Sequence, residues 1–184
     1  MYSVGAIALR GRGPMQLTEM FLAELVREAA STRRALERVP EGRNDWKPHQ
    51  KSMPLGYLAT LVATILGWID FMVNEDQLDM TPKGDSKYKQ KDLTTTSELL
   101  AALDESVAKA RKALENTTDE HLMKTWRFVV GGHVASENPR HIMIRDAVFS
   151  HLAHHRGQLT VYLRFNEVAV PAIYGPSADE GHFQ

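Results

Sequence analysis

The sequence of 184 residues contains no cysteine. This absence excludes disulfides, thiolate nucleophiles and every zinc or iron–sulfur site that depends on cysteine ligands. Any metal site must therefore use nitrogen and oxygen ligands. The chain is long enough to fold without such crosslinks, because a domain of this size buries about 70% of the surface that its unfolded chain exposes.

The sequence also lacks a charge excess and a long apolar run. It has 22 Lys and Arg against 23 Asp and Glu, for a formal net charge of −1, which excludes nucleic-acid binding through bulk positive charge. We find no apolar run of the roughly 18 residues that a membrane span needs, and no secretory signal at the start. We therefore expect a cytoplasmic protein that contacts neither nucleic acid nor membrane.

What remains has the composition of one ordinary globular domain, with 43% hydrophobic and 24% charged residues. Residues 1–14 have three glycines, a proline and no sustained hydrophobic period. We interpret them as an N-terminal extension. Residues 15–184 are predicted to form a single domain that ends in a non-helical tail after Asn166.

Four segments have apolar residues every three or four positions, as amphipathic helices do. Thr95 and Glu98 form a capping box at the start of the third segment, and Thr117 and Glu120 repeat the pattern before a short helical turn. The predicted helices cover residues 16–38, 54–74, 96–115 and 140–165.

Between these helices lie a long connection and a segment with strand character. Residues 74–94 are polar and rich in lysine, and we expect a surface loop. Thr125–Val130 alternates weakly, and Gly131 and Gly132 could turn it into a second strand at 133–136, which predicts a small β-hairpin. The fold class is therefore all-α, a four-helix bundle with this hairpin before the last helix.

Two histidines interrupt the apolar face of the last helix. His151 and His155 are one turn apart, so a single cation could bind both imidazoles. Two buried imidazoles each need a partner, and a divalent metal would satisfy both. The alternative is that they are core histidines satisfied by carbonyls or water. His154 lies off this face and is interpreted as a solvated or interface residue. The face consists of Ile144, Val148, His151, His155, Leu159 and Tyr162.

The segment His151-Leu-Ala-His-His-Arg-Gly-Gln-Leu159 resembles the HxxxHRGQ segment of the DinB/YfiT-like superfamily. The resemblance extends over roughly residues 15–180, through Trp46-Lys-Pro-His49 and Lys51-Ser-Met-Pro-Leu-Gly56. It implies an up-down-down-up four-helix bundle, usually a homodimer, in which three histidines face a shared cavity and bind nickel, zinc or iron. On this resemblance, His151 and His155 match the two metal ligands of the last helix.

The third histidine of that family has no counterpart here, because Leu61 occupies its place in Leu55–Ala63. Three outcomes stay open: a weak site completed by water or a ligand, a site completed by another side chain, or a metal-free cavity. His141 is about 15 Å from His151 along one helix, too far to share the ion. We hypothesise that Asp179 or Glu180 of the tail approaches the pair, with a surface tail as the alternative. His49, His121 and His133 lie where the sequence fixes no distance.

Neighbouring residues suggest supporting roles. The family resemblance implies that Arg156 and Gln158 support packing around the site. Gly157 is expected to permit the close approach of another helix. Arg145 and Asp146 suggest an internal ion pair or a partner contact. The aromatic residues Tyr57, Trp68 and Tyr162 are either core or cavity lining.

These observations leave an enzyme and a binding protein as competing functions. On the family resemblance, the enzyme would be a metal-dependent transferase of the thiol S-transferase type, or a hydrolase, acting on a small-molecule substrate. Its catalytic residues are not identified by any further motif. The alternative is a non-catalytic, small-ligand-binding or stress-related dimeric bundle without bound metal. The loss of the third ligand at Leu61 favours this second function.

Overall fold

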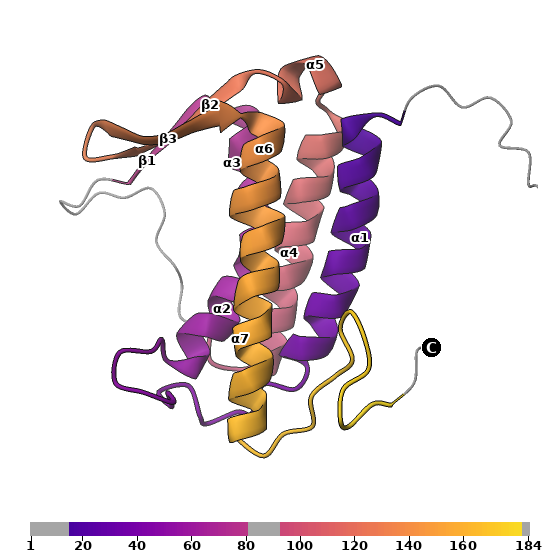
Figure 1. Cartoon of the computed structure of the whole chain (residues 1–184), viewed down its shortest axis with the longest axis vertical. Helices are drawn as coiled ribbons and strands as arrows, with labels where there is room; N and C mark the ends of the chain where they lie inside the picture. Colours follow the sequence, from indigo (N-terminus) through magenta and orange to yellow (C-terminus); the bar gives the residue numbers. More distant parts are fainter. Residues whose placement is uncertain (1–14, 81–92, 182–184) are drawn as a thin grey trace, which may run out of the picture.

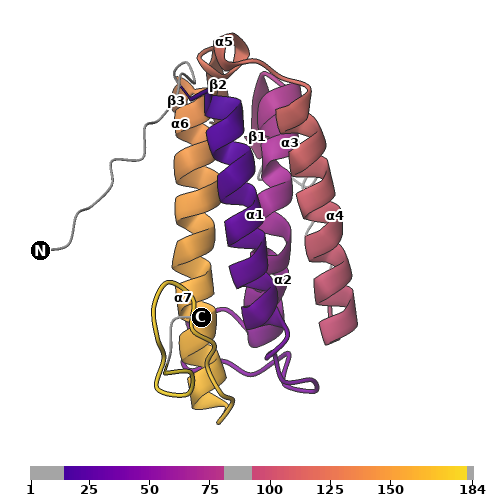
Figure 2. The ribbon, with the colours of Figure 1, turned by 90° about the vertical axis from the view of Figure 1, so that its right-hand side faces the viewer.

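The computed structural model describes residues 15–80 and 93–181. The predicted extension at 1–14 lies outside the described residues, and so do 81–92 of the expected surface loop. The protein is mostly helical, with long helical segments packed lengthwise and a small sheet at one end (Figures 1 and 2). The elements are α1 (Leu17–Leu36), α2 (Leu55–Thr64), η1 (Ile65–Gly67), α3 (Trp68–Asn74), β1 (Gln77–Met80), α4 (Thr96–Glu115), α5 (Asp119–Leu122), β2 (Thr125–Val130), β3 (His133–Pro139), α6 (Arg140–Ile144), η2 (Arg145–Ser150) and α7 (His151–Phe165).

Helices α1 and α4 follow the predicted ranges, and polar side chains accept hydrogen bonds from the backbone N–H groups at their N-terminal ends. The capping box of Thr95 and Glu98 is present at the start of α4. The next cap is one residue later than predicted, since the Thr118 hydroxyl accepts from the backbone N–H of His121. The Asp119 carboxylate in turn accepts from the first two backbone N–H groups of α1, at 2.8 and 3.1 Å. This contact ties α5 to the start of α1.

The second predicted helix, 54–74, is interrupted by the 3₁₀ turn η1. At Gly67 an added Cβ would lie 3.3 Å from the Ser106 hydroxyl oxygen of α4. Because glycine has no side chain here, α4 can pack closely against this turn. Gly157, from which we expected such an approach, has nothing within 4 Å of an added Cβ, so that prediction is wrong.

The helical segment Leu55–Asn74 contradicts the expectation that no apolar run is long enough to span a membrane. Leu55–Asn74 is 20 residues long with a mean hydropathy of 1.6, which is enough by length and composition for a membrane span. In the folded chain, 67% of the 18-residue stretch with this mean hydropathy is buried inside the molecule. The hydropathy therefore reflects a core helix surrounded by other protein segments.

The last helical segment is continuous but contains a wider turn. Residues Arg145–Ser150 form the π-helix η2, which begins after α6 and ends directly before His151. π-Helical turns are rare and frequently occur at functional sites. The predicted helix at 140–165 is therefore confirmed in extent, while its wider turn was not anticipated.

The sheet contains the predicted hairpin and one strand more. Strands β2 and β3 are antiparallel, and Gly131 and Gly132 have φ values of 58° and 81°, as a tight turn between twisted strands requires. Strand β1 pairs in parallel with β2. The expectation that 74–94 is entirely a loop is wrong at Gln77–Met80. A strand of four residues within a polar segment gives too short a pattern to be predicted from the sequence.

A buried arginine ties the last helix to the first. Arg156 is 1% exposed and donates to the Glu28 carboxylate at 2.6 Å and to the Thr32 hydroxyl at 2.9 Å. Tyr174 of the C-terminal tail donates its hydroxyl to the same carboxylate at 2.8 Å. A charge this deeply buried is stable only with such partners. The expected packing role of Arg156 is confirmed.

Replacing Arg156 by methionine should destabilise the fold by about 3–5 kcal/mol, because the buried Glu28 carboxylate would lose its charged partner. Urea denaturation measures the change. The matched control is Arg164→Met on the same helix, whose partner Asp179 and own side chain are 27% and 49% exposed. This control should cost at most about 1 kcal/mol. Equal losses in the two variants would contradict the assignment.

Candidate functional site

A cavity of about 580 Å³ lies between the sheet and the helical segments. Its volume is in the range that holds a small organic ligand. Most of its wall is aromatic, aliphatic or methionine side chain, with few polar groups. The lining residues are Tyr57, Leu61, Trp68, Phe71, Met72, Leu78, Met80, Trp126, Phe128, Ser136, Asn138, Met143, Asp146, Ala147 and His151.

One face of the sheet forms a wall of this cavity. Trp126 pairs with Asn138 across the hairpin, and Phe128 pairs with Ser136. Leu78 of β1 lies opposite Phe128 on the other side. Because alternate residues of a strand share a face, these side chains all point to the same side. The structure thus assigns the hairpin to the site, a role that the weak alternation in residues 125–130 did not reveal.

The two predicted histidines are in contact, and one of them reaches the cavity. The Nε2 atoms of His151 and His155 are 2.7 Å apart. His151 lines the cavity beside Trp68, with the two ring centroids 5.5 Å apart. His155 lies deeper and is 8% exposed. The turn spacing inferred from sequence therefore places both imidazoles together, as expected for positions i and i+4.

The pair continues into a chain of polar side chains. His155 Nδ1 is 2.8 Å from Gln158 Oε1, and Gln158 Nε2 is 3.1 Å from His154 Nε2. An amide oxygen only accepts, so in this arrangement His155 Nδ1 carries a proton and its Nε2 presents a lone pair to His151. A neutral His151 has a single ring N–H, which can donate either to His155 Nε2 or to the Ala147 carbonyl. His154 itself is exposed, as interpreted from the sequence.

Both imidazoles are held in the neutral form at neutral pH. Burial lowers the pKa of His151, and the charge of His155 lowers it further, while a hydrogen bond with the Ala147 carbonyl acts in the opposite direction. Burial also lowers the pKa of His155, opposed by the hydrogen bond with Gln158. A neutral imidazole can donate or accept a hydrogen bond, and it can bind a metal.

The residues present do not supply the three-histidine set that the resemblance implies. Leu61 lines the same cavity as His151 and has no donor atom. Within residues 15–80 and 93–181, no three His, Cys, Asp or Glu side chains are grouped to hold a metal ion. The Nε2 atoms are also closer than the roughly 3.3 Å that separates two nitrogens on tetrahedral zinc. A metal would need a further ligand and a small opening of the pair.

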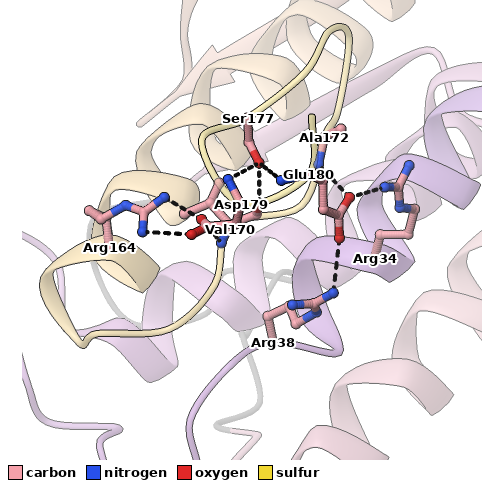
Figure 3. A network of polar contacts seen from close by, with 8 residues as sticks. All are labelled: Arg34, Arg38, Arg164, Val170, Ala172, Ser177, Asp179 and Glu180. Carbon is pink, nitrogen blue, oxygen red and sulfur yellow. Dashed lines mark hydrogen bonds and ion pairs between the residues drawn. The ribbon is translucent and has the colours of Figure 1, made fainter. Parts of the chain in front are cut away.

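The hypothesis that the tail completes this set is wrong. Asp179 pairs with Arg164 of α7 and accepts the backbone N–H of Val170 at 2.8 Å (Figure 3). Glu180 pairs with Arg34 of α1 and, at 3.0 Å, with Arg38 of the turn that follows α1. These interactions lower the pKa of both carboxyls, chiefly through Arg164 for Asp179 and through the Ala172 N–H for Glu180. The tail carboxylates bind arginines, which are stronger partners than neutral imidazoles.

Several other expected residues also have assigned partners. The ring nitrogens of His121 and His141 contact the backbone carbonyls of Val73 and Leu122, at 2.8 and 3.2 Å. The ring of His49 accepts from the Lys51 backbone N–H at 3.2 Å. His121 and His141 thus connect segments that are distant in sequence, and His49 stabilises a local turn.

The remaining residues singled out in the sequence lie either in the cavity wall or in contact with other segments. Tyr57 and Trp68 line the cavity, whereas Tyr162 donates its hydroxyl to the Met53 carbonyl at 3.2 Å. Arg145 pairs with Glu24 of α1 and not with Asp146, so the internal pair of neighbours is not formed. Asp146, which belongs to the π turn before His151, instead lines the cavity.

Comparison with known proteins gives a family and two similar folds. Residues 24–159 match the model of the DinB superfamily. A DinB-like protein of Bacillus subtilis is 17% identical with a TM-score of 0.59, over 83% of this chain and 96% of that one. A DinB-like protein of Bacillus cereus is 21% identical with a TM-score of 0.63, over 85% and 97%. No curated protein matches the sequence.

The histidine pair should make stability depend on pH between about 7.5 and 5.5. The pKa values of His151 and His155 are lowered by folding, so below their unfolded value of about 6.5 the unfolded chain binds more protons. The free energy of unfolding should therefore fall as the pH falls through this range. Urea denaturation at a series of pH values measures the slope.

The control is the double variant His151→Gln, His155→Gln, in which this slope should decrease. The tail carboxyls do not interfere, because their lowered pKa values affect stability only below about pH 4.5. An unchanged slope in the double variant would show that other groups cause the dependence.

Proposed function

The chain belongs to the DinB superfamily, and we propose that it binds a small, largely apolar molecule in the cavity between its sheet and its helices. The observation that carries this proposal is the cavity of about 580 Å³ with a neutral imidazole in an otherwise mostly apolar wall. Apolar enclosure supplies affinity, and a few placed polar groups supply orientation.

His151 is the polar contact that the helical wall offers to such a ligand. It lies at the end of the chain of contacts through His155 and Gln158, which fixes the orientation of the pair. Three methionines, Met72, Met80 and Met143, adapt the apolar wall to the shape of the ligand. Leu61, at the place of the family's third histidine, adds apolar surface here and no donor.

The proposal includes the arrangement and assembly that the family resemblance implies. We propose the up-down-down-up order of helices, which is supported by α2–α3 and α4 both running toward the sheet end in Figure 1. We also propose a cytoplasmic homodimer. Light scattering of the purified protein tests the assembly, and the mass of a single chain in solution would overturn it.

A metal-dependent transferase of the thiol S-transferase type, or a hydrolase, is the second candidate function. It is favoured by the two imidazoles one helical turn apart, one of which lines the cavity. Leu61 in the same wall counts against it, because leucine supplies no ligand. Nickel, zinc or iron would be the ion. Since the described residues lack a third ligand, we derive no catalytic step through it.

Elemental analysis of the untagged protein, purified without chelator, separates the two candidates. For a binding protein, we expect less than about a tenth of an equivalent of metal, because two imidazoles alone hold an ion weakly. Leu61→His should raise the content toward one equivalent, and Leu61→Gln is the matched control without an imidazole. Stoichiometric metal in the wild type that is lost in His155→Ala would support the enzyme instead.

Filling the cavity should abolish ligand binding without unfolding the chain. Ala147 lines the cavity on the helical wall, and Ala147→Phe would occupy part of its volume. A neutral naphthalene dye should bind the wild type saturably with increased fluorescence, and the variant should bind about tenfold more weakly. Circular dichroism verifies that the variant is folded. Equal binding by both proteins would place the dye elsewhere and contradict the proposal.

A further inference from the structure

The face of the sheet that lines the cavity carries hydrogen-bond donors without good acceptors. We propose that this face recognises the carbonyl group of a neutral ligand, such as a ketone, ester or amide, through Trp126 and Asn138. The inference rests on the proposed function, since it assigns the chemistry of the ligand that occupies the same cavity.

The first observation is the indole N–H of Trp126. This side chain is 1% exposed and lines the cavity. Within the described part of the chain, its Nε1 atom has no hydrogen-bond partner. Buried donors are nearly always satisfied in folded proteins, because burial without an acceptor is costly. An acceptor atom supplied by a ligand would satisfy this N–H.

The second observation is the pair of polar side chains beside Trp126. Asn138 is its direct cross-strand neighbour, and Ser136 lies two residues away on the same face. Among the described residues, the acceptor of both side chains is the thioether sulfur of Met143, which lies 3.9 Å from Asn138 Nδ2 and 3.8 Å from Ser136 Oγ. A thioether is a weak acceptor. The side-chain donors of Trp126, Asn138 and Ser136 are therefore available to a stronger acceptor than the Met143 sulfur.

The charge of the wall selects a neutral acceptor over an anion. Among the described residues that line the cavity, no lysine or arginine is present, and Asp146 brings a carboxylate. A carboxylate or phosphate ligand would enter a low-dielectric space without a cation and close to this negative charge, which is unfavourable. A carbonyl oxygen accepts the same hydrogen bonds without a charge to desolvate. The aromatic and methionine side chains around it favour an apolar body.

The experiment compares three probes of one shape: 2-acetylnaphthalene, its hydrocarbon analogue 2-isopropenylnaphthalene, and 2-naphthoate. Calorimetry or fluorescence titration gives their affinities for the full-length protein. We expect the ketone to bind at least about tenfold more tightly than the hydrocarbon, because a donor site left unpaired rejects an analogue without an acceptor. The naphthoate should bind most weakly.

Two variants and one spectroscopic measurement locate the effect. In Trp126→Phe and in Asn138→Leu, the ratio of the ketone affinity to the hydrocarbon affinity, measured in the same variant, should fall about fivefold or more. In the wild type, the ¹H–¹⁵N resonance of the Trp126 indole should shift on adding ketone and not on adding hydrocarbon. This resonance is one of three tryptophan signals and is assigned by its loss in Trp126→Phe.

The outcomes distinguish this inference from the function on which it rests. Equal binding of ketone and hydrocarbon, with no ketone-specific indole shift, would overturn the carbonyl recognition and leave the apolar cavity intact. Tighter binding of the naphthoate would overturn the neutral class of ligand. Failure of all three probes to bind would overturn the proposed function itself.

Discussion

The buried guanidinium of Arg156 fixes the rotation of the last helix. It donates to Glu28 and Thr32 of α1, and the tail reaches the same carboxylate through Tyr174. Rotating α7 about its axis would withdraw the charge from these partners and leave Glu28 buried alone, which is strongly unfavourable. Because His155 precedes Arg156 directly, the same constraint sets the direction of the histidine pair.

The cavity depends on two walls that come from distant parts of the chain. The helical wall carries His151 directly after a π turn, and the other wall is one face of the three-stranded sheet. Trp126 of this sheet is packed into the main hydrophobic core while also lining the cavity. The site is therefore positioned by the core, and its polar groups are few and held on regular elements.

The local elements could be predicted well because their signals are local. Apolar spacing and the cap at Thr95 define α4, and the glycine pair at 131–132 defines the hairpin. The interruptions of the helices could not be read in the same way. The 3₁₀ turn at Gly67 lies where Ser106 of α4 packs closely against the backbone. Strand β1 forms by hydrogen bonding with the backbone of β2. Both are consequences of tertiary contact.

The sequence by itself determined the family resemblance, the helix faces, the contact of His151 with His155 and the replacement of the third histidine by Leu61. Those properties follow from residue identity and from the helical repeat alone. Only the tertiary structure decided what each polar side chain binds. Asp179 binds Arg164 of α7 and Glu180 binds Arg34 of α1, and Trp126 and Asn138 join His151 around one cavity. Such partners depend on the three-dimensional positions of distant segments, which no local pattern encodes.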